Sequence, residues 1–388
     1  MNRRPMHIAF NGWFWDQPHT GSGQYLRHLL AALHQRAPEH RLTLVVPARM
    51  ATLEALPPQV DVLPMPLRRG GHPGKVWFEQ HLFPRAVARL QADIAHVPYW
   101  GPPLRSPAPL ICTVLDVIPL LVPEYSAGLR NRLYTSLVRA AARGASHLLT
   151  LSAEGQRQIA AHIGVPAERV TVTPLAADKV FHPEQGAERD GEVRARYGLD
   201  DADDFVLYLG AYAIHKNVRQ LVAAYTYVAQ GMGQGVPLVL AGHTPAAWGT
   251  PRFPDLPAYI EELGLAPYVR WIGPVDEVDK PALYRLASVF AFPSLLEGFG
   301  LGPLEALASG TPVVACEASS IPEVTGDAAY LVAPGDSRAM GGAILSLLMQ
   351  PDHAATLRNR GLARARDFSW RATAEGTLAA YEQVLGTR

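Results

Sequence analysis

Short apolar runs that suit strands alternate with helical patterns along the whole chain of 388 residues. Strands that alternate with helices form parallel sheets with helices on both faces. The length also exceeds that of one typical hydrophobic core. We therefore predict an α/β chain with two Rossmann-like, doubly wound domains facing a cleft. The strands are expected near residues 7–10, 42–46, 93–97, 110–115, 146–151 and 169–173, and again near 205–209, 237–241, 269–272, 289–292, 312–315 and 329–332.

The domain boundaries follow from where this pattern pauses. Residues 1–178 form the expected N-terminal domain, and the polar stretch 179–192 reads as a structureless linker. Residues 193–366 form the second domain, and residues 367–388 a last helix that we expect to pack back on the first. Ligands of such sheets bind at the carboxyl ends of the strands, so the residues that follow the strands are the candidates for function.

Composition excludes several classes of protein. Hydrophobic residues make up 48% of the chain and charged residues 18%, which is typical of a globular protein and not of a disordered one. No apolar run reaches about twenty residues, and the start lacks a signal-peptide core. Cys112 and Cys316 lie in apolar runs of different halves, where reduced, buried thiols are expected. These features predict a cytoplasmic protein.

The segment from Ser294 to Glu305 carries the strongest functional signal. Glu297 and Glu305 stand eight residues apart around a loop with three glycines, between an apolar strand and a helix that begins near Pro303. A helix start offers bare N–H groups and a positive dipole end to a phosphate. Carboxylates accept hydrogen bonds from hydroxyl groups. A nucleotide sugar has both phosphates and hydroxyls, so this combination favours one as the ligand.

This segment resembles the Glu-x7-Glu motif of the retaining family-4 glycosyltransferases, which have the GT-B fold and use nucleoside diphosphate sugars. The resemblance implies that Glu297 binds hydroxyls of the transferred sugar and Glu305 those of the ribose. It also implies that the backbone of residues 299–302, which are Phe299, Gly300, Leu301 and Gly302, binds the diphosphate or the sugar. Further segments that resemble the family are residues 20–25, 93–98, 114–119, 209–217 and 368–384.

Lys216 follows the first strand of the second domain after a short loop. A cation there can neutralise the diphosphate as the glycosidic bond breaks. The family commonly has an arginine beside this lysine, whereas this chain has His215. A histidine can replace that arginine only when protonated, or as a single neutral donor. A surface lysine at a helix start is the alternative for Lys216.

The N-terminal half offers further candidates. Gly21, Ser22 and Gly23 precede an amphipathic helix, a setting suited to phosphate, although Gln24 stands where the family often has arginine. Asp116 follows a predicted strand and is a candidate base or acceptor-orienting group; a turn-capping carboxylate is the alternative. Leu115 replaces the histidine of many relatives. His96, at another strand end, is expected to face the cleft on the acceptor side or else to be a buried core histidine.

No metal site is expected. Asp201-Ala-Asp203 has the Asp-x-Asp pattern of metal-dependent glycosyltransferases, but it precedes a strand and reads as a solvated turn. The histidines show no metal-ligand spacing, and cysteines do not cluster. The resemblance therefore implies a metal-independent transferase that needs no cofactor.

The expected reaction moves a hexose from a nucleoside diphosphate sugar, with GDP-mannose favoured, to a saccharide or lipid-linked saccharide. That preference follows from the likeness of the Lys216 motif to those of bacterial mannosyl- and rhamnosyl-transferases. No nucleic-acid partner is expected. Two alternatives remain: a non-catalytic nucleotide-sugar-binding scaffold, since Leu115, His215 and Gln24 depart from the family, and a nucleotide-sugar epimerase of the same fold.

The charge distribution points to an anionic partner. The first 184 residues hold 19 basic and 12 acidic residues, although the net charge of the chain is zero. Arg68, Arg69 and Lys75 flank Trp77 and Phe78, a cluster suited to a membrane interface. A predicted helix contains Arg130, Arg132 and Arg139. We expect peripheral association with the inner face of a membrane; the alternatives are solvated arginines and, for Trp77 and Phe78, core positions.

Overall fold

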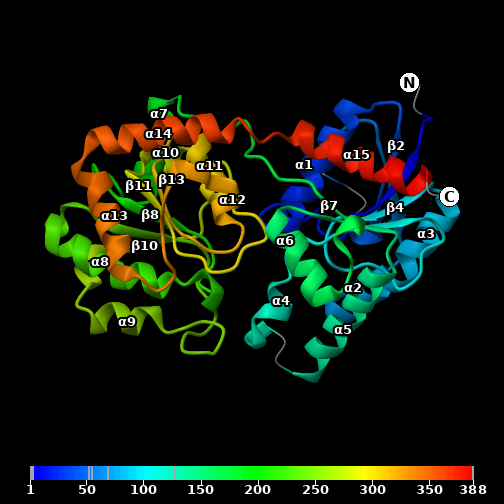
Figure 1. The fold of residues 1–388 in the computed structure, drawn as a ribbon, viewed down its shortest axis with the longest axis horizontal. Helices are drawn as coiled ribbons and strands as arrows, with labels where there is room; N and C mark the ends of the chain where they lie inside the picture. Colours follow the sequence, from blue (N-terminus) through cyan, green and yellow to red (C-terminus); the bar gives the residue numbers. More distant parts are fainter. Residues whose placement is uncertain are drawn as a thin grey trace. The chain divides into compact units, whose positions relative to one another are not determined.

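The computed structural model describes residues 4–50, 53, 56–67, 70–125, 128–184 and 186–386. The chain divides into two compact units (Figure 1). The first consists of Met1–Leu175 together with Ser369–Arg388, and the second of Ala176–Phe368. Each unit is built around its own parallel sheet.

The first unit contains a seven-stranded sheet in the order β3-β2-β1-β4-β5-β6-β7. Neighbouring strands pair in parallel, for example Phe10 of β1 beside His96 of β4. The order reverses between β1 and β4, so the helices that connect the strands lie on both faces. The strands are β1 (His7–Asn11), β2 (Arg41–Pro47), β3 (Val60–Met65), β4 (Ile94–Val97), β5 (Leu110–Thr113), β6 (His147–Thr150) and β7 (Val170–Val172).

The last helix, α15, packs against α1 and against β6 and β7, so the chain ends within the first unit. The ring of Trp370 stacks on that of His28 at 4.8 Å between centroids. The other face of the sheet buries a core between strand residues and residues of η2, α3, α5 and η4. The helices are α1 (Gly21–Arg36), α2 (Gly71–Trp77), α3 (Phe83–Leu90), α4 (Ile118–Leu121), α5 (Leu129–Gly144), α6 (Ala153–Gln158) and α15 (Trp370–Gly386), with π-helical turns η2 (Phe78–Leu82) and η4 (Ile159–Ile163).

The second unit contains a six-stranded sheet in the order β10-β9-β8-β11-β12-β13. Its order reverses between β8 and β11, which pair in parallel. The strands are β8 (Val206–Leu209), β9 (Leu238–Ala241), β10 (Val269–Gly273), β11 (Val289–Phe292), β12 (Val313–Cys316) and β13 (Ala329–Val332). The helices are α7 (Ala187–Arg196), α8 (Val218–Met232), α9 (Leu256–Glu262), α10 (Lys280–Leu286), α11 (Leu301–Ala308), α12 (Ile321–Thr325), α13 (Ser337–Met349) and α14 (Pro351–Ala365).

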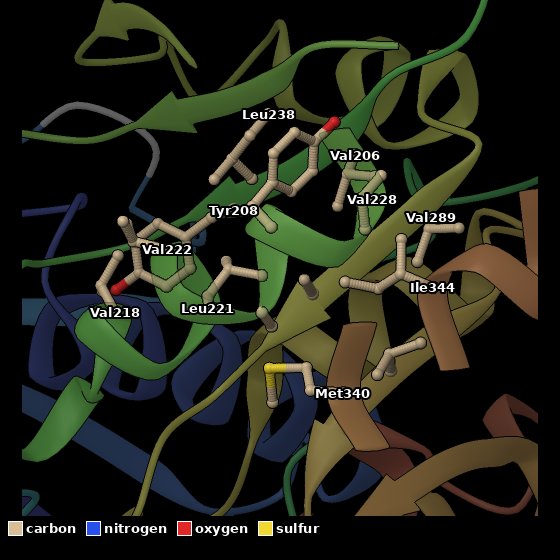
Figure 2. Close-up of a cluster of buried hydrophobic side chains, with 14 of the residues drawn as sticks. Val206, Tyr208, Val218, Leu221, Val222, Val228, Leu238, Val289, Met340 and Ile344 are labelled. Carbon is tan, nitrogen blue, oxygen red and sulfur yellow. The ribbon is translucent and has the colours of Figure 1, made fainter. Parts of the chain in front are cut away.

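Side chains of the second sheet alternate between two cores, as period-two strands require. Val206 and Tyr208 of β8 lie in the core beneath α8 and α13, with Met340 and Ile344 (Figure 2). Leu207, between them in the sequence, lies in the opposite core against α10 and α11. Both faces are therefore apolar, which is why these strands read as continuous hydrophobic runs.

Every predicted strand run overlaps an observed strand, so the prediction of two Rossmann-like sheets is confirmed. The sequence reading missed β3, which contains Pro64. Proline removes a backbone donor and is confined to edge strands, and β3 lies at the edge of its sheet.

The expectation of a structureless linker over residues 179–192 was wrong from residue 187 onward, because α7 begins there. The helix has few apolar residues and is held by charged groups. Arg285 donates to Asp190 at 2.5 Å, and Arg196 and Tyr197 both donate to the fully buried Asp279. These partners lie far along the chain, so the sequence pattern alone gave no sign of the helix.

Candidate active site

The main candidate site lies where the strand order of the second unit reverses. Lys216 stands in the loop after β8, and Glu297 in the loop after β11, the two strands that flank this point. Open α/β sheets bind their ligands at the carboxyl ends of such strands. The fold thus brings together two residues that are 81 positions apart.

Lys216 and Glu297 contact each other directly. Lys216 Nζ lies 2.5 Å from Glu297 Oε1, with the two side chains 20% and 13% exposed. The ammonium group also lies 5.7 Å from the centre of the Phe292 ring. The loops are joined through the backbone as well, since Leu295 N donates to His215 O at 2.9 Å. A partly shielded cation and carboxylate are therefore held together beside the helix start of α11.

His215 lies next to this pair and is almost completely buried. Burial lowers its pKa to about 4, and the neighbouring Lys216 ammonium contributes in the same direction. The imidazole is consequently neutral near pH 7. Of the two roles weighed for His215, only that of a neutral hydrogen-bonding group is left.

Two serines that the sequence reading missed hold the Glu297 loop in place. Ser319 Oγ donates to Glu297 O at 2.8 Å and accepts from Glu297 N at 3.2 Å. Ser320 Oγ donates to Phe299 O at 2.6 Å. Both serines follow β12, at the same edge of the sheet as Glu297. Their position after a strand was the signal that could have identified them.

The loop ends at Gly300, the N-cap residue that directly precedes α11. Its φ is 116°, in the region that favours glycine, and an added Cβ would lie 2.8 Å from Ile321 Cδ1. The N–H groups of Leu301 and Gly302 belong to the first turn, so no carbonyl within the helix is available to them. Phe299 is buried and packs edge-to-face against Phe368. Residues 299–302 therefore form a glycine-containing loop and the first turn of a helix, and binding of a phosphate there stays a prediction.

Glu305 lies in the middle of α11 and is 7% exposed. Tyr284 donates its hydroxyl hydrogen to Glu305 Oε2 at 3.1 Å. Burial raises the pKa of the carboxyl to about 7, against the opposing effect of Lys280 and of the Tyr284 hydrogen bond. A buried carboxylate near half ionisation at neutral pH can accept further hydroxyl donors, so it suits the role of a ribose-binding group.

Gln220, also missed from the sequence, fixes the loop that ends at Lys216. Its Oε1 accepts from Asn217 Nδ2 at 2.6 Å and from Gly335 N at 2.8 Å. Asn217 has φ 51°, a conformation that asparagine tolerates better than most residues. This bonding holds the turn that directs Lys216 toward Glu297.

In the first unit one of the two predicted glycines, Gly23, has a structural role. Helix α1 begins at Gly21, and the side chain of Thr20 accepts from Gly23 N at 3.1 Å. A Cβ at Gly23 would lie 2.1 Å from Gln17 O. Gly23 therefore permits close backbone packing and its N–H is already bonded, so its assignment to phosphate binding was wrong. Gly21 and Ser22 remain candidates.

Asp116 follows β5 and is partly buried. Its Oδ1 accepts from Ile118 N at 3.0 Å, which is the turn-capping role given as the alternative. Its predicted role toward an acceptor stays a prediction.

His96 does not face a strand-end site, and its placement on the acceptor side was wrong. The side chain is fully buried in β4. Its Nδ1 lies 2.6 Å from Tyr381 Oη of α15, and its Nε2 lies 2.8 Å from Thr113 Oγ1. Burial lowers its pKa to about 3. His96 is a satisfied core residue under the last helix.

Asp201, the first residue of the Asp-x-Asp pattern, pairs on the surface with Arg270 at 2.5 Å. Among the described residues, no three His, Cys, Asp or Glu side chains lie together as a metal site would require. Within the same residues, no helix has the length and apolar character needed to cross a membrane.

Comparison with known proteins shows the family of the chain. Residues 19–179 match the family described as Glycosyltransferase Family 4, and residues 190–364 the family described as Glycosyl transferases group 1. The chain is 32% identical over 305 residues to O-antigen chain mannosyltransferase B of Escherichia coli, a match that covers 78% of each protein.

The chain belongs to glycosyltransferase family 4. It is also 31% identical over 257 residues to MMP alpha-(1->4)-mannosyltransferase of Mycolicibacterium hassiacum, which covers 65% of this chain and 57% of that protein. Sucrose-phosphate synthase from Thermosynechococcus elongatus shares the fold with a TM-score of 0.75 at 22% identity, over 99% of this chain and 100% of that one. WaaG, a glycosyltransferase involved in lipopolysaccharide biosynthesis, has a TM-score of 0.72 at 17% identity, over 98% and 100% of the two chains. The glycosyltransferase has the GT-B fold.

Proposed function

We propose that this glycosyltransferase moves mannose from GDP-mannose to a saccharide or lipid-linked saccharide, with retention of configuration at the anomeric carbon. The observation that carries the proposal is the contact between Lys216 and Glu297 beside the free helix start of α11. The preference for mannose is supported by the names of the relatives, which include O-antigen chain mannosyltransferase B and MMP alpha-(1->4)-mannosyltransferase.

Each element of the site has a role in donor binding. The diphosphate lies at the N–H groups of Leu301 and Gly302, where the helix dipole favours negative charge. Lys216 neutralises the charge that grows on the leaving diphosphate. Glu297 accepts hydrogen bonds from the sugar hydroxyls and orients the lysine through their contact. The positive charge supplied by Lys216 and the helix start makes the proposed reaction independent of a metal ion.

Glu305 binds the ribose hydroxyls. Removing a carboxylate from water deprives it of hydrogen-bond donors, which is why burial raises its pKa. Two vicinal hydroxyls restore two such bonds and thereby favour the ionised form. Donor binding and ionisation of Glu305 are consequently coupled.

In the first unit, Asp116 orients the acceptor hydroxyl or accepts its proton, directly or with help from the donor diphosphate. Gly21 and Ser22 at the start of α1 contact a phosphate of the donor or the acceptor. Attack and departure take place on the same face of the sugar, as retention requires. We place the reaction at the cytoplasmic side of a membrane that carries the acceptor.

A screen of donors tests the proposal. The melting temperature of the purified chain is measured with GDP-, UDP-, ADP- and dTDP-sugars, because ligand binding stabilises the folded state by mass action. The proposal predicts the largest rise with GDP-mannose. Stabilisation by GDP-mannose without any donor hydrolysis or transfer would favour a binding scaffold, and conversion of the free donor into another nucleotide sugar would favour an epimerase. No stabilisation by any nucleotide sugar would refute donor binding altogether.

A further inference from the structure

A basic and apolar groove on the first unit has no part in the donor site. It runs between α2 with its π-helical extension η2 and helix α5, and has a volume of about 480 Å³. We call it the α2–α5 groove. Its lining includes His72, Trp77, His81, Arg130, Leu133 and Leu137, and none of the described residues that line it is acidic.

Large apolar side chains stand exposed along this groove. Trp77 is 49% exposed, Leu133 62% and Leu129 74%. Leu129, Leu133 and Leu137 recur every four residues and so follow one side of α5. Leu104, 53% exposed, is joined to the groove by Gln80, whose Oε1 accepts from Leu104 N at 3.0 Å. Water is an unfavourable environment for such a cluster, which indicates that something covers it.

The acidic residue of η2, Glu79, is fully buried and paired with Lys75, so it adds no charge to the surface of the groove. Helix α5 carries four arginines and no acidic residue between Leu129 and Gly144. Arg130 and Arg132, in its exposed first turns, form no ion pair with any residue that the structure describes. Exposed arginines beside tryptophan and leucine match the chemistry of an anionic lipid surface, where acyl chains take the apolar groups and headgroups take the cations.

The structure also revises which residues of the predicted membrane patch are available. Lys75 is engaged with Glu79 and with the Tyr134 hydroxyl, and its ammonium group lies 4.8 Å from the centre of the Tyr99 ring. Phe78 is fully buried. Arg68 and Arg69 lie outside the described residues. The exposed surface is therefore built from Trp77 and the first turns of α5.

We propose that the α2–α5 groove and the start of α5 dock this chain peripherally on an anionic lipid bilayer, with Trp77, Leu129 and Leu133 in the interface and Arg130 and Arg132 at the headgroups. The biological role of this docking, the capture of a lipid-linked acceptor, rests on the proposed function. Gln80 also bonds to the carbonyl of Pro102, in the loop that follows β4. The carboxyl end of β4 belongs to the sheet edge at which an acceptor is expected to bind. Docking through the groove therefore brings this edge close to the lipid.

Vesicle sedimentation tests the proposal with the full chain. Phosphatidylcholine vesicles are compared with vesicles in which about a third of the lipid is phosphatidylglycerol. Each basic residue near an anionic surface contributes roughly 1 kcal/mol, so replacing Arg130 and Arg132 by glutamate should lower binding to the anionic vesicles by at least about tenfold. The double variant Arg85→Glu, Arg89→Glu on α3 makes the same change in net charge at exposed positions elsewhere on the first unit and should bind as the wild type does.

A site-specific probe reports which surface enters the interface. Both native cysteines are buried, so an environment-sensitive thiol dye can be attached at Leu133→Cys, and at the exposed Met349→Cys of the second unit as a control. Only the dye at position 133 should shift to the blue on anionic vesicles. Equal shifts at both positions, equal binding by the two charge variants, or no binding to any vesicle would each overturn the proposal. Donor hydrolysis in the absence of lipid should be the same in both charge variants, so failure to dock is distinguishable from failure of the proposed reaction.

Discussion

Replacing Glu305 by glutamine should stabilise the protein and weaken nucleotide binding together. Burial raises the pKa of this carboxyl from 4.5 to about 7. Because the folded pKa is raised, the native state holds the proton more tightly than the unfolded chain does. Stability therefore falls as pH rises from about 4.5 and levels off above about 7.

The magnitude follows from the size of this shift. A difference of about 2.5 pKa units corresponds to roughly 3 kcal/mol of stability lost at pH 8, and to less than about 1 kcal/mol at pH 5. Glutamine keeps the shape and the oxygen that accepts from Tyr284, but it carries no charge. Glu305→Gln should therefore raise the free energy of unfolding by up to about 3 kcal/mol at pH 8 and by much less at pH 5.

Thermal unfolding of both proteins from pH 5 to pH 8 measures this effect, and calorimetry with GDP measures binding. At about 2–4 °C per kcal/mol for a unit of this size, the variant should melt roughly 6–12 °C higher at pH 8. Its affinity for GDP should be about 10- to 100-fold lower, since a hydrogen bond to a charged group is lost. Glu261→Gln, at an exposed position on α9, should change neither quantity. Equal pH profiles for wild type and Glu305→Gln, or unchanged GDP affinity, would refute this reasoning.

Three further substitutions test other parts of the site. Lys216→Ala should lower kcat about 10²–10³-fold and raise the donor KM less, because leaving-group charge is greatest in the transition state. An effect on KM alone would mean that Lys216 stabilises the bound donor and the transition state equally. Asp116→Asn should leave GDP affinity unchanged while the rate of transfer falls at least about tenfold. An unchanged rate of transfer would mean that Asp116 only caps the turn, through its bond to Ile118 N. Gly300→Ala forces a Cβ to within 2.8 Å of Ile321 Cδ1 at a φ of 116° and should cost roughly 1–3 kcal/mol of stability as well as GDP affinity. Gly233→Ala, at φ 63° with open space around it, should keep GDP affinity, and equal affinities for the two alanine variants would count against a role for the α11 start.

The sequence predicted the two sheets because buried parallel strands are apolar on both faces, and such runs are visible without any tertiary information. It did not predict β3, whose proline and half-exposed side chains suit an edge strand. It also missed α7, since that helix is held by ion pairs to Asp279 and Arg285, more than 80 residues away. A helix that is stabilised by polar partners far away in the sequence shows no periodic pattern of apolar residues.

The candidate site shows the same division. Glu297, Glu305 and the helix start of α11 could be predicted as candidates because motif, strand and helix are adjacent in the sequence. The contact between Lys216 and Glu297 could be inferred only from strand order, because the residues are 81 positions apart. His96 was misplaced because a residue at a strand end can point to either face, and here it points under α15. Ser319, Ser320 and Gln220 act through loops that meet only in the folded chain.

Donor hydrolysis tests the central claim most directly, namely that Lys216, Glu297 and the start of α11 form a catalytic donor site. Release of GDP from GDP-mannose is followed with purified wild-type protein and with Lys216→Ala, both without acceptor and with saccharide acceptors. The account predicts slow hydrolysis by the wild type, acceleration by a suitable acceptor, and a loss of at least about tenfold in the variant. Undetectable turnover by a wild-type protein that still binds GDP-mannose, or equal turnover by the two proteins, would contradict it.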